Sequence, residues 1–159
     1  SNYNEFKQGE ASLDRIFELL DLQPTVTDAA EATILPTVSG KVEYRNVSFA
    51  YQAHQPVLKD LNLRALPGEA IALVGSSGAG KTTLANLLTR FYDPQSGEIL
   101  IDGIDIRSVT LRSLRRQIGI VPQETILFSG TIAQNIAFGQ ADFDLEAVQD
   151  AAKIANAHQ

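Results

Sequence analysis

The sequence predicts an α/β fold, and three observations support that prediction. The apolar residues 70–74 predict a short buried strand, and residues 75–82, which read Gly-Ser-Ser-Gly-Ala-Gly-Lys-Thr, predict a glycine-rich turn directly after it. The segment that begins at Thr83 has the pattern of a helix. Upstream, apolar residues roughly alternate in 41–51 and again in 57–66, which predicts two strands.

The bulk composition narrows the possible functions. The chain has 159 residues, enough for one domain, and 44% of them are hydrophobic, as in ordinary globular proteins. Its net charge of −6 argues against a nucleic-acid-binding surface. The absence of cysteine excludes disulfides and thiolate metal sites. No apolar run approaches the roughly 18 residues that a membrane-spanning helix needs.

The first forty residues differ in pattern from the rest of the chain. Apolar residues recur at helical spacing in 3–20 and predict a helix, which packs either on its own domain or as a connection from an upstream domain. Residues 21–40 lose this periodicity and contain prolines and threonines, so they form a linker or a loop laid across a surface. We expect the domain boundary near Gly40, with residues 1–40 as the connecting helix and linker and residues 41–159 as the domain.

Both ends of the chain indicate a piece of a longer polypeptide. Residue Ser1 is not an initiator methionine and stands at the start of a periodic pattern, and no helix-terminating signal precedes Gln159.

Further elements follow the glycine-rich turn and its helix. Residues 93–97 predict a turn, 98–101 a short strand that runs into Asp102-Gly103, 111–116 a short helix and 118–121 a buried strand that stops at Pro122. A last helix begins at Asp144, its predicted N-cap. Its inner face is predicted to comprise Leu145, Val148, Ala152 and Ala155.

The glycine-rich turn fits the phosphate-loop pattern G-x-x-x-x-G-K-[ST] at every fixed position. Glycines allow successive backbone N–H groups to point into one concavity, and the helix N-terminus adds roughly half a positive charge behind them. Lys81 would reach the outer phosphates and the Thr82 hydroxyl would ligate Mg²⁺. The alternative is a glycine turn that binds nothing, but the order of residues favours a nucleotide site in a P-loop NTPase core.

Several separated stretches extend this motif. They are Val-Ser-Phe-Ala-Tyr at 47–51, Val-Leu-Lys-Asp-Leu-Asn-Leu at 57–63, Pro-Gly-Glu at 67–69, Phe-Tyr-Asp-Pro at 91–94, Ser-Gly-Glu-Ile at 96–99, Ile-Asp-Gly at 101–103, Val-Pro-Gln at 121–123, Leu-Phe-Ser-Gly-Thr-Ile at 127–132 and Asn-Ile at 135–136. Together with the glycine-rich turn they recur in order from residue 47 to residue 136. In this ordered set the chain resembles the nucleotide-binding domain of an ATP-binding-cassette (ABC) transporter of the exporter type.

The resemblance implies a set of functional residues. Lys81 and Gln123 would be catalytic, with Thr82 and Gln123 as Mg²⁺ ligands. Tyr51 would stack on the adenine ring, because an aromatic face binds a base with little selectivity, although a tyrosine packed at a strand end is the alternative. Gln123 would contact Mg²⁺ or the attacking water, as a neutral amide can. The residues expected to contact ATP are Tyr51, Val57, Gly75, Ser76, Ser77, Gly78, Ala79, Gly80, Lys81, Thr82 and Thr83, with Thr83 near the α-phosphate.

The resemblance also implies what the given sequence lacks. In this family the signature stretch Leu-Ser-Gly-Gly-Gln, the Walker B strand with its aspartate and adjacent catalytic glutamate, and the switch histidine would all follow Gln159. The expected fold is therefore a P-loop core with an antiparallel β subdomain, truncated before the Walker B strand. Residues 70–74 would then have an unpaired side, and we expect poor solubility of the isolated segment.

Four residues that could be mistaken for ligands or catalytic groups fall outside this set. Asp102 belongs to a turn of the antiparallel part in this family, so we reject it as a Mg²⁺ ligand. Glu124 is expected to be a solvated acid. His54 and His158 do not stand in the switch context and are expected to be solvated.

The expected activity is ATP binding by this chain and ATP hydrolysis in the full-length protein, where it would drive export. The implied partners are a second nucleotide-binding domain facing head to tail and a fused upstream transmembrane domain, at the cytoplasmic face of the cell membrane; no nucleic acid is expected. Two rival functions remain, a P-loop small-molecule kinase and a non-catalytic nucleotide-sensing module. The kinase would use the basic cluster Arg107, Arg112, Arg115 and Arg116 as a phosphate lid. The other interpretations of this cluster are a solvated face, or a surface that docks to the membrane domain or to lipid.

Overall fold

The computed structural model describes residues 13, 17, 21, 23–140 and 142–157. The chain forms two compact units, residues 1–119 and 120–159, and each is described below by itself. The helix predicted for residues 3–20 lies almost wholly outside the described residues.

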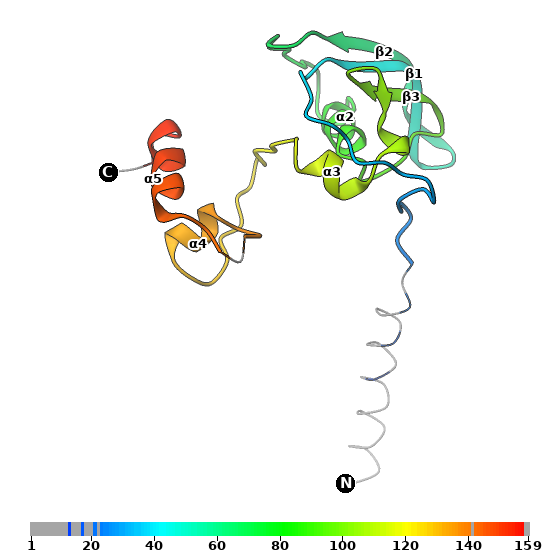
Figure 1. Ribbon diagram of the computed structural model, residues 1–159. Helices are drawn as coiled ribbons and strands as arrows, with labels where there is room; N and C mark the ends of the chain where they lie inside the picture. Colours follow the sequence, from blue (N-terminus) through cyan, green and yellow to red (C-terminus); the bar gives the residue numbers. More distant parts are fainter. Residues whose placement is uncertain (1–12, 14–16, 18–20, 22, 141, 158–159) are drawn as a thin grey trace. The chain divides into compact units, whose positions relative to one another are not determined.

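A four-stranded antiparallel sheet organises the first unit (Figure 1). Its strands are β1 (Val42–Gln52), β2 (Gln55–Ala65), β3 (Ser96–Ile101) and β4 (Ile104–Asp105), in the order β2-β1-β3-β4. On the central strand β1, Tyr44 pairs with Leu63 of β2 on one side and with Ile99 of β3 on the other. This sheet confirms the predicted antiparallel subdomain, and its strands lie close to the predicted ranges.

Helix α2 (Lys81–Leu88) packs on the sheet through its apolar face. Leu87 is fully buried and Leu84 is nearly so, because they lie three residues apart on one side of the helix. The buried Tyr44 hydroxyl donates a hydrogen bond to the Leu84 carbonyl oxygen at 2.9 Å. The core also contains Leu35, Val47, Phe49, Leu58, Ile99, Ile101, Ile106, Val109 and Leu114. Helix α2 is therefore held in place by the sheet beneath it.

Residues 27–41 run across the surface of this unit rather than leaving it. Thr33 forms a parallel bridge with Val109, and the Leu35 side chain is buried in the core. The backbone N–H of Leu35 donates to the Ser113 hydroxyl at 2.9 Å. The N–H of Val38 donates to the Gln117 side-chain oxygen, also at 2.9 Å. Two of the segment's backbone N–H groups thus donate to side chains some eighty residues away. The boundary near Gly40 stays a prediction.

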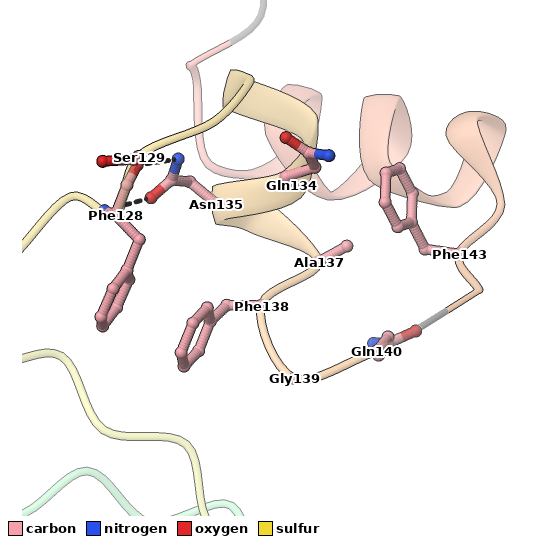
Figure 2. A pocket seen from close by; sticks show the side chains of 9 residues that line it. All are labelled: Phe128, Ser129, Gln134, Asn135, Ala137, Phe138, Gly139, Gln140 and Phe143. Carbon is pink, nitrogen blue, oxygen red and sulfur yellow. Dashed lines mark hydrogen bonds between the residues drawn. The ribbon is translucent and has the colours of Figure 1, made fainter.

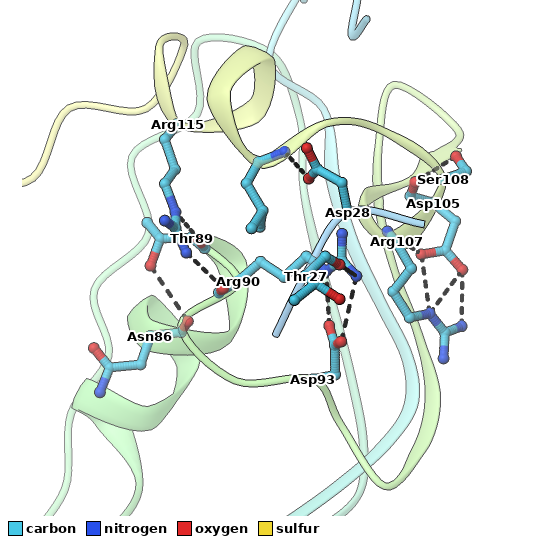
Figure 3. Close-up of polar contacts among 11 residues, drawn as sticks. Thr27, Asp28, Asn86, Thr89, Arg90, Asp93, Asp105, Arg107, Ser108 and Arg115 are labelled. Atoms are coloured by element: carbon cyan, nitrogen blue, oxygen red, sulfur yellow. Dashed lines mark hydrogen bonds and ion pairs between the residues drawn. The ribbon is translucent and has the colours of Figure 1, made fainter. Parts of the chain in front are cut away.

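A short 3₁₀ turn, η1 (Ile106–Ser108), and helix α3 (Leu111–Arg115) follow the sheet. The Arg115 guanidinium donates to the carbonyl oxygens of Thr89 and Arg90 at 3.0 and 2.8 Å, beyond the last turn of α2 (Figure 3). The buried Arg90 side chain pairs with Asp93 at 2.8 Å and donates to the Thr27 carbonyl at 3.2 Å. Arginine side chains thus tie the C-terminal end of α2 to its surroundings.

The predicted basic cluster is divided by these contacts. Arg115 caps α2, and Arg107 is paired with Asp105 at 2.8 Å. Arg112 and Arg116 are exposed, and their side chains have neither a hydrogen bond nor an ion pair to any described residue.

Two predicted strands are absent, and the prediction was wrong for both. Residues 70–74 and 118–121 join no sheet, and Val74 and Val121 are 89% and 96% exposed. An apolar run becomes a buried strand only when neighbouring strands supply its hydrogen bonds and cover its faces. No strand in the described part of the chain pairs with either run. Ile71 and Leu73 instead border an apolar cavity of about 240 Å³ that Tyr44 and Leu84 also line.

The second unit contains α4 (Ile132–Ile136) and α5 (Leu145–Ile154). Thr131 and Gln134 form a reciprocal capping box at the start of α4. Asn135 holds the preceding loop by accepting from the Phe128 N–H at 2.8 Å and donating to its carbonyl at 2.9 Å (Figure 2). Asp144 caps α5 as predicted.

The predicted inner face of α5 is confirmed only in part. Val148 and Ala152 are buried, but Leu145 is 56% exposed and Ala155 is also exposed. At the other end of this unit, the rings of Phe128 and Phe138 stack with centroids 4.2 Å apart. They line a cavity of about 320 Å³ (Figure 2).

Gly97 provides a test of how tightly the sheet is packed. It has φ 81°, and a Cβ atom there would lie 2.4 Å from the carbonyl oxygens of Arg45 and Asn46. Gly103 has φ 86° but open space around it. Because both substitutions carry the same backbone strain, Gly103→Ala should destabilise the domain by about 1 kcal/mol. Gly97→Ala adds a backbone clash and should cost at least about 3 kcal/mol.

Thermal unfolding of the two variants beside the wild type measures this difference. Equal melting temperatures for Gly97→Ala and Gly103→Ala would contradict the close approach of β3 to β1.

Candidate functional site

The glycine-rich loop leads directly into α2, as the sequence predicts. Gly80 is the N-cap residue in a left-handed conformation with φ 86°, and it offers no side-chain cap. A Cβ atom at Gly80 would lie 3.0 Å from Leu58 Cδ2 and 3.3 Å from Val57 Cγ1, so β2 presses against the loop. The N–H groups in the first turn of α2 therefore have no acceptor within the helix or from a cap, and they carry the positive end of the helix dipole.

The Lys81 side chain folds back over this loop. Its ammonium group donates to the carbonyl oxygens of Gly75 and Ser76 at 2.8 and 2.7 Å. The Ala79 N–H donates to the Ser76 carbonyl at 3.2 Å and closes the turn. A cation and the free N–H groups of α2 thus belong to one loop, which suits an anion with several oxygens. Thr82 is exposed in the first turn.

Aromatic side chains gather beside this loop. Tyr51, at the end of β1, meets the rings of Phe49 and Tyr92 edge to face, with centroids 4.9 and 5.1 Å away. Half of the Tyr51 surface stays exposed. Tyr51 and Tyr92 also line a cavity of about 310 Å³ with Thr25, Val26 and Asp93. This arrangement offers an aromatic surface next to the first turn of α2.

The Tyr51 hydroxyl joins the aromatic surface to α2. It lies 3.2 Å from the Thr83 hydroxyl oxygen, and the Asn86 side-chain N–H donates to it at 3.4 Å. Thr83 is buried, unlike the exposed Thr82. Sequence reasoning missed Asn86 and Tyr92; a signal for Asn86 exists, because it lies three residues after Thr83 and so on the same side of the helix.

The predicted site residues fall into two groups. Tyr51, Val57 and residues 75–83 belong to the first unit, where β1, β2, the loop and α2 bring them together. Gln123 is exposed and belongs to the second unit. Its pairing with Thr82 therefore stays a prediction.

A metal ion at this site would depend on few protein ligands. No cluster of three or more Asp, Glu or His side chains that could hold a metal occurs in the described part of the chain. Thr82 supplies a hydroxyl oxygen in the first turn of α2. Oxygen ligands of this kind suit Mg²⁺, which is commonly held by one or two protein groups together with phosphate oxygens and water.

Asp102 has a structural role. Its carboxylate accepts from the backbone N–H groups of Lys41 and Ser39. The hydrogen bonds from Lys41 and Ser39 hold the pKa of Asp102 below its usual range, although desolvation opposes them. Asp102 thus fastens the strap of residues 27–41 to the turn after β3.

A family model, curated relatives and a solved structure all match this chain to the same family. The family model described as "ABC transporter" matches residues 58–159. The ATP-dependent lipid A-core flippase of Syntrophus aciditrophicus is 53% identical over 155 residues, which cover 98% of this chain and 26% of that protein. ABC transporter B family member 29 of Arabidopsis thaliana, described as chloroplastic, is 49% identical over 99% of this chain and 25% of that protein.

A solved structure agrees with these relatives. It is described as a bacterial Atm1-family ABC exporter with ATP bound, and it matches with a TM-score of 0.82 and 43% identity over 98% of this chain and 28% of its own. The chain thus spans about a quarter of the length of the relatives it matches. Within the described residues, no helix has both the length and the apolar character to cross a bilayer. On the match to the family model over residues 58–159, this chain belongs to the ABC transporter family.

Proposed function

We propose that this chain binds ATP with Mg²⁺ at residues 75–83 and, in the full-length protein, hydrolyses it to drive export of a substrate across a membrane. The observation that supports this most is the Lys81 ammonium folded over a loop whose helix has no side-chain cap at its N-terminus. A polyphosphate can replace the Gly75 and Ser76 carbonyls as the acceptor for that ammonium. The exporter structure that resembles this chain is described as having ATP bound.

Each part of the loop has a defined task in this proposal. Lys81 binds the outer phosphates as a point charge, and backbone N–H groups of residues 77–83 donate to their oxygens. Tyr51 stacks on the base and leaves the phosphates to the loop. Mg²⁺, which the Thr82 hydroxyl and the Gln123 amide oxygen would hold, supplies charge neutralisation at the phosphates. The binding energy is therefore concentrated on the phosphate end of the nucleotide.

Hydrolysis needs more than this loop. Phosphoryl transfer to water requires a positioned water and additional charge around the γ-phosphate. The family resemblance assigns those groups to sequence after Gln159 and to a second nucleotide-binding domain that faces this one head to tail. Residues 1–159 alone should therefore bind ATP but hydrolyse it negligibly. The fused transmembrane domain would place the site at the cytoplasmic face of the membrane, as the membrane-transport names of the relatives suggest.

The kinase alternative loses its main support. A phosphate lid needs free guanidinium groups, whereas Arg115 caps α2 and Arg107 pairs with Asp105. No observation in the described residues favours a kinase over a transporter ATPase.

Lys81→Ala tests the phosphate site. Removal of the ammonium loses a hydrogen bond to a charged group, worth about 1.5–3 kcal/mol, so the Kd for Mg-ATP should rise about tenfold or more. Calorimetric titration of the full-length protein measures it. Lys59→Ala, which removes an exposed lysine from β2, is the matched control and should leave the Kd unchanged. An unchanged Kd in Lys81→Ala would contradict the proposed site.

Gln123→Ala separates binding from hydrolysis. If Gln123 positions the attacking water, its loss should lower kcat by about tenfold or more and change the Kd for ATP little. Steady-state phosphate release and nucleotide titration give the two values. Gln149→Ala, an exposed glutamine on α5, should change neither. Equal loss of affinity and rate in Gln123→Ala would show that Gln123 acts only by holding Mg²⁺ and the nucleotide, and not on the attacking water.

A further inference from the structure

We propose that Asn86, Tyr51 and Thr83 form a directed chain of hydrogen bonds that aims the Thr83 hydroxyl hydrogen at the nucleotide phosphates. Asn86 is then a positioning residue that acts through Tyr51. This inference rests on the proposed nucleotide site and deepens it, because it links the base-stacking side chain to the phosphate-binding helix.

The three side chains come from two elements that the fold holds together. Thr83 lies in the first turn of α2, and Asn86 follows one turn later on the same side. Tyr51 reaches them from the end of β1, with its ring supported by Phe49 and Tyr92. The Tyr51 hydroxyl oxygen lies 3.2 Å from Thr83 Oγ1 and 3.4 Å from Asn86 Nδ2.

The direction of the chain follows from which groups can donate. The Asn86 amide nitrogen only donates, so the Tyr51 oxygen must accept from it. The one hydrogen of the Tyr51 hydroxyl is then available for Thr83. Either hydroxyl could donate at their 3.2 Å separation, and in the arrangement that we propose Tyr51 donates to the Thr83 oxygen. Thr83 keeps its own hydrogen. Within the described part of the chain, Tyr51 is the one hydrogen-bond partner of the Thr83 hydroxyl.

That remaining hydrogen needs an acceptor. Thr83 is only 4% exposed, so water has little access to its side chain. Thr83 belongs to the first turn of α2, whose N–H groups have no side-chain cap and which also carries Lys81. A phosphate oxygen there would accept from a hydroxyl that Tyr51 already polarises, and such charge-assisted bonds are the strong ones. The Tyr51 hydroxyl would thus link the ring that stacks on the base to the Thr83 hydroxyl that binds phosphate.

Asn86→Asp tests the direction of the chain. An ionised carboxylate only accepts, so it would take the Tyr51 hydrogen and turn the Tyr51 oxygen into an acceptor for Thr83. The Thr83 hydrogen would then point away from the phosphates. The Kd for Mg-ADP should rise about tenfold in Asn86→Asp and only about threefold in Asn86→Ala, which leaves the Tyr51 hydroxyl free to rotate.

The added negative charge needs its own control. Ala85→Asp places the same charge at the neighbouring exposed position of α2, outside the chain of hydrogen bonds. Tyr51→Phe removes the hydroxyl and keeps the aromatic ring. In the Tyr51→Phe background, Asn86→Asp should weaken Mg-ADP binding no more than Ala85→Asp does, because the reversal acts through the missing hydroxyl.

The titrations use the purified full-length protein with Mg-ADP and with adenosine as probes. The inference predicts that Asn86→Asp weakens Mg-ADP binding about tenfold while adenosine affinity stays within about twofold, since adenosine has no phosphate. It is overturned if Asn86→Asp matches Asn86→Ala, if its effect persists unchanged in the Tyr51→Phe background, or if adenosine affinity falls equally.

These outcomes are distinguishable from a failure of the proposed function. If the wild type binds no Mg-ADP, both the nucleotide site and this inference are wrong. If the wild type binds it and Lys81→Ala weakens the binding while Asn86→Asp does not, the inference alone is wrong.

Discussion

The N-terminus of α2 is the constraint on which the candidate site depends. Gly80 caps this helix without a side chain, and Lys81 folds its ammonium over the preceding loop. The ammonium has two carbonyl oxygens as partners but no anionic side chain among the described residues, and the N–H groups of the first helical turn have no side-chain cap. The arrangement is consistent with a site that an anion completes. The other features of the first unit keep this helix end in position.

Support for α2 comes from the sheet, from α3 and from the strap. Tyr44 on β1 holds the Leu84 carbonyl, and Arg115 on α3 donates to carbonyls just beyond the last turn (Figure 3). The strap of residues 27–41 contacts the same region, since Arg90 donates to the Thr27 carbonyl. A helix fixed along its length can hold its first turn rigid without a cap, and a rigid site loses less entropy on binding. The chain before residue 41 is thus bonded to the domain that carries the loop.

Local sequence signals predicted much of the fold. The loop motif predicts a phosphate site at residues 75–83, which stays a prediction, and alternation correctly predicted β1 and β2 because half-buried strands show their period directly. The runs 70–74 and 118–121 failed because a fully buried strand depends on neighbours that its own sequence does not specify. The strap was ambiguous because its bonds run to Ser113 and Gln117, far along the chain. Asn86 was missed because its partner, Tyr51, is brought to it only by tertiary packing.

The most direct test of this account asks which part of ATP provides the affinity. Calorimetric titration of the full-length protein with Mg-ATP and with adenosine compares the phosphate end with the base. Because the loop concentrates its donors and its cation on the phosphates, Mg-ATP should bind at least about 100-fold tighter than adenosine, which is about 2.7 kcal/mol. Equal affinities, or no heat for Mg-ATP with folded protein, would contradict the claim that this loop is a polyphosphate site.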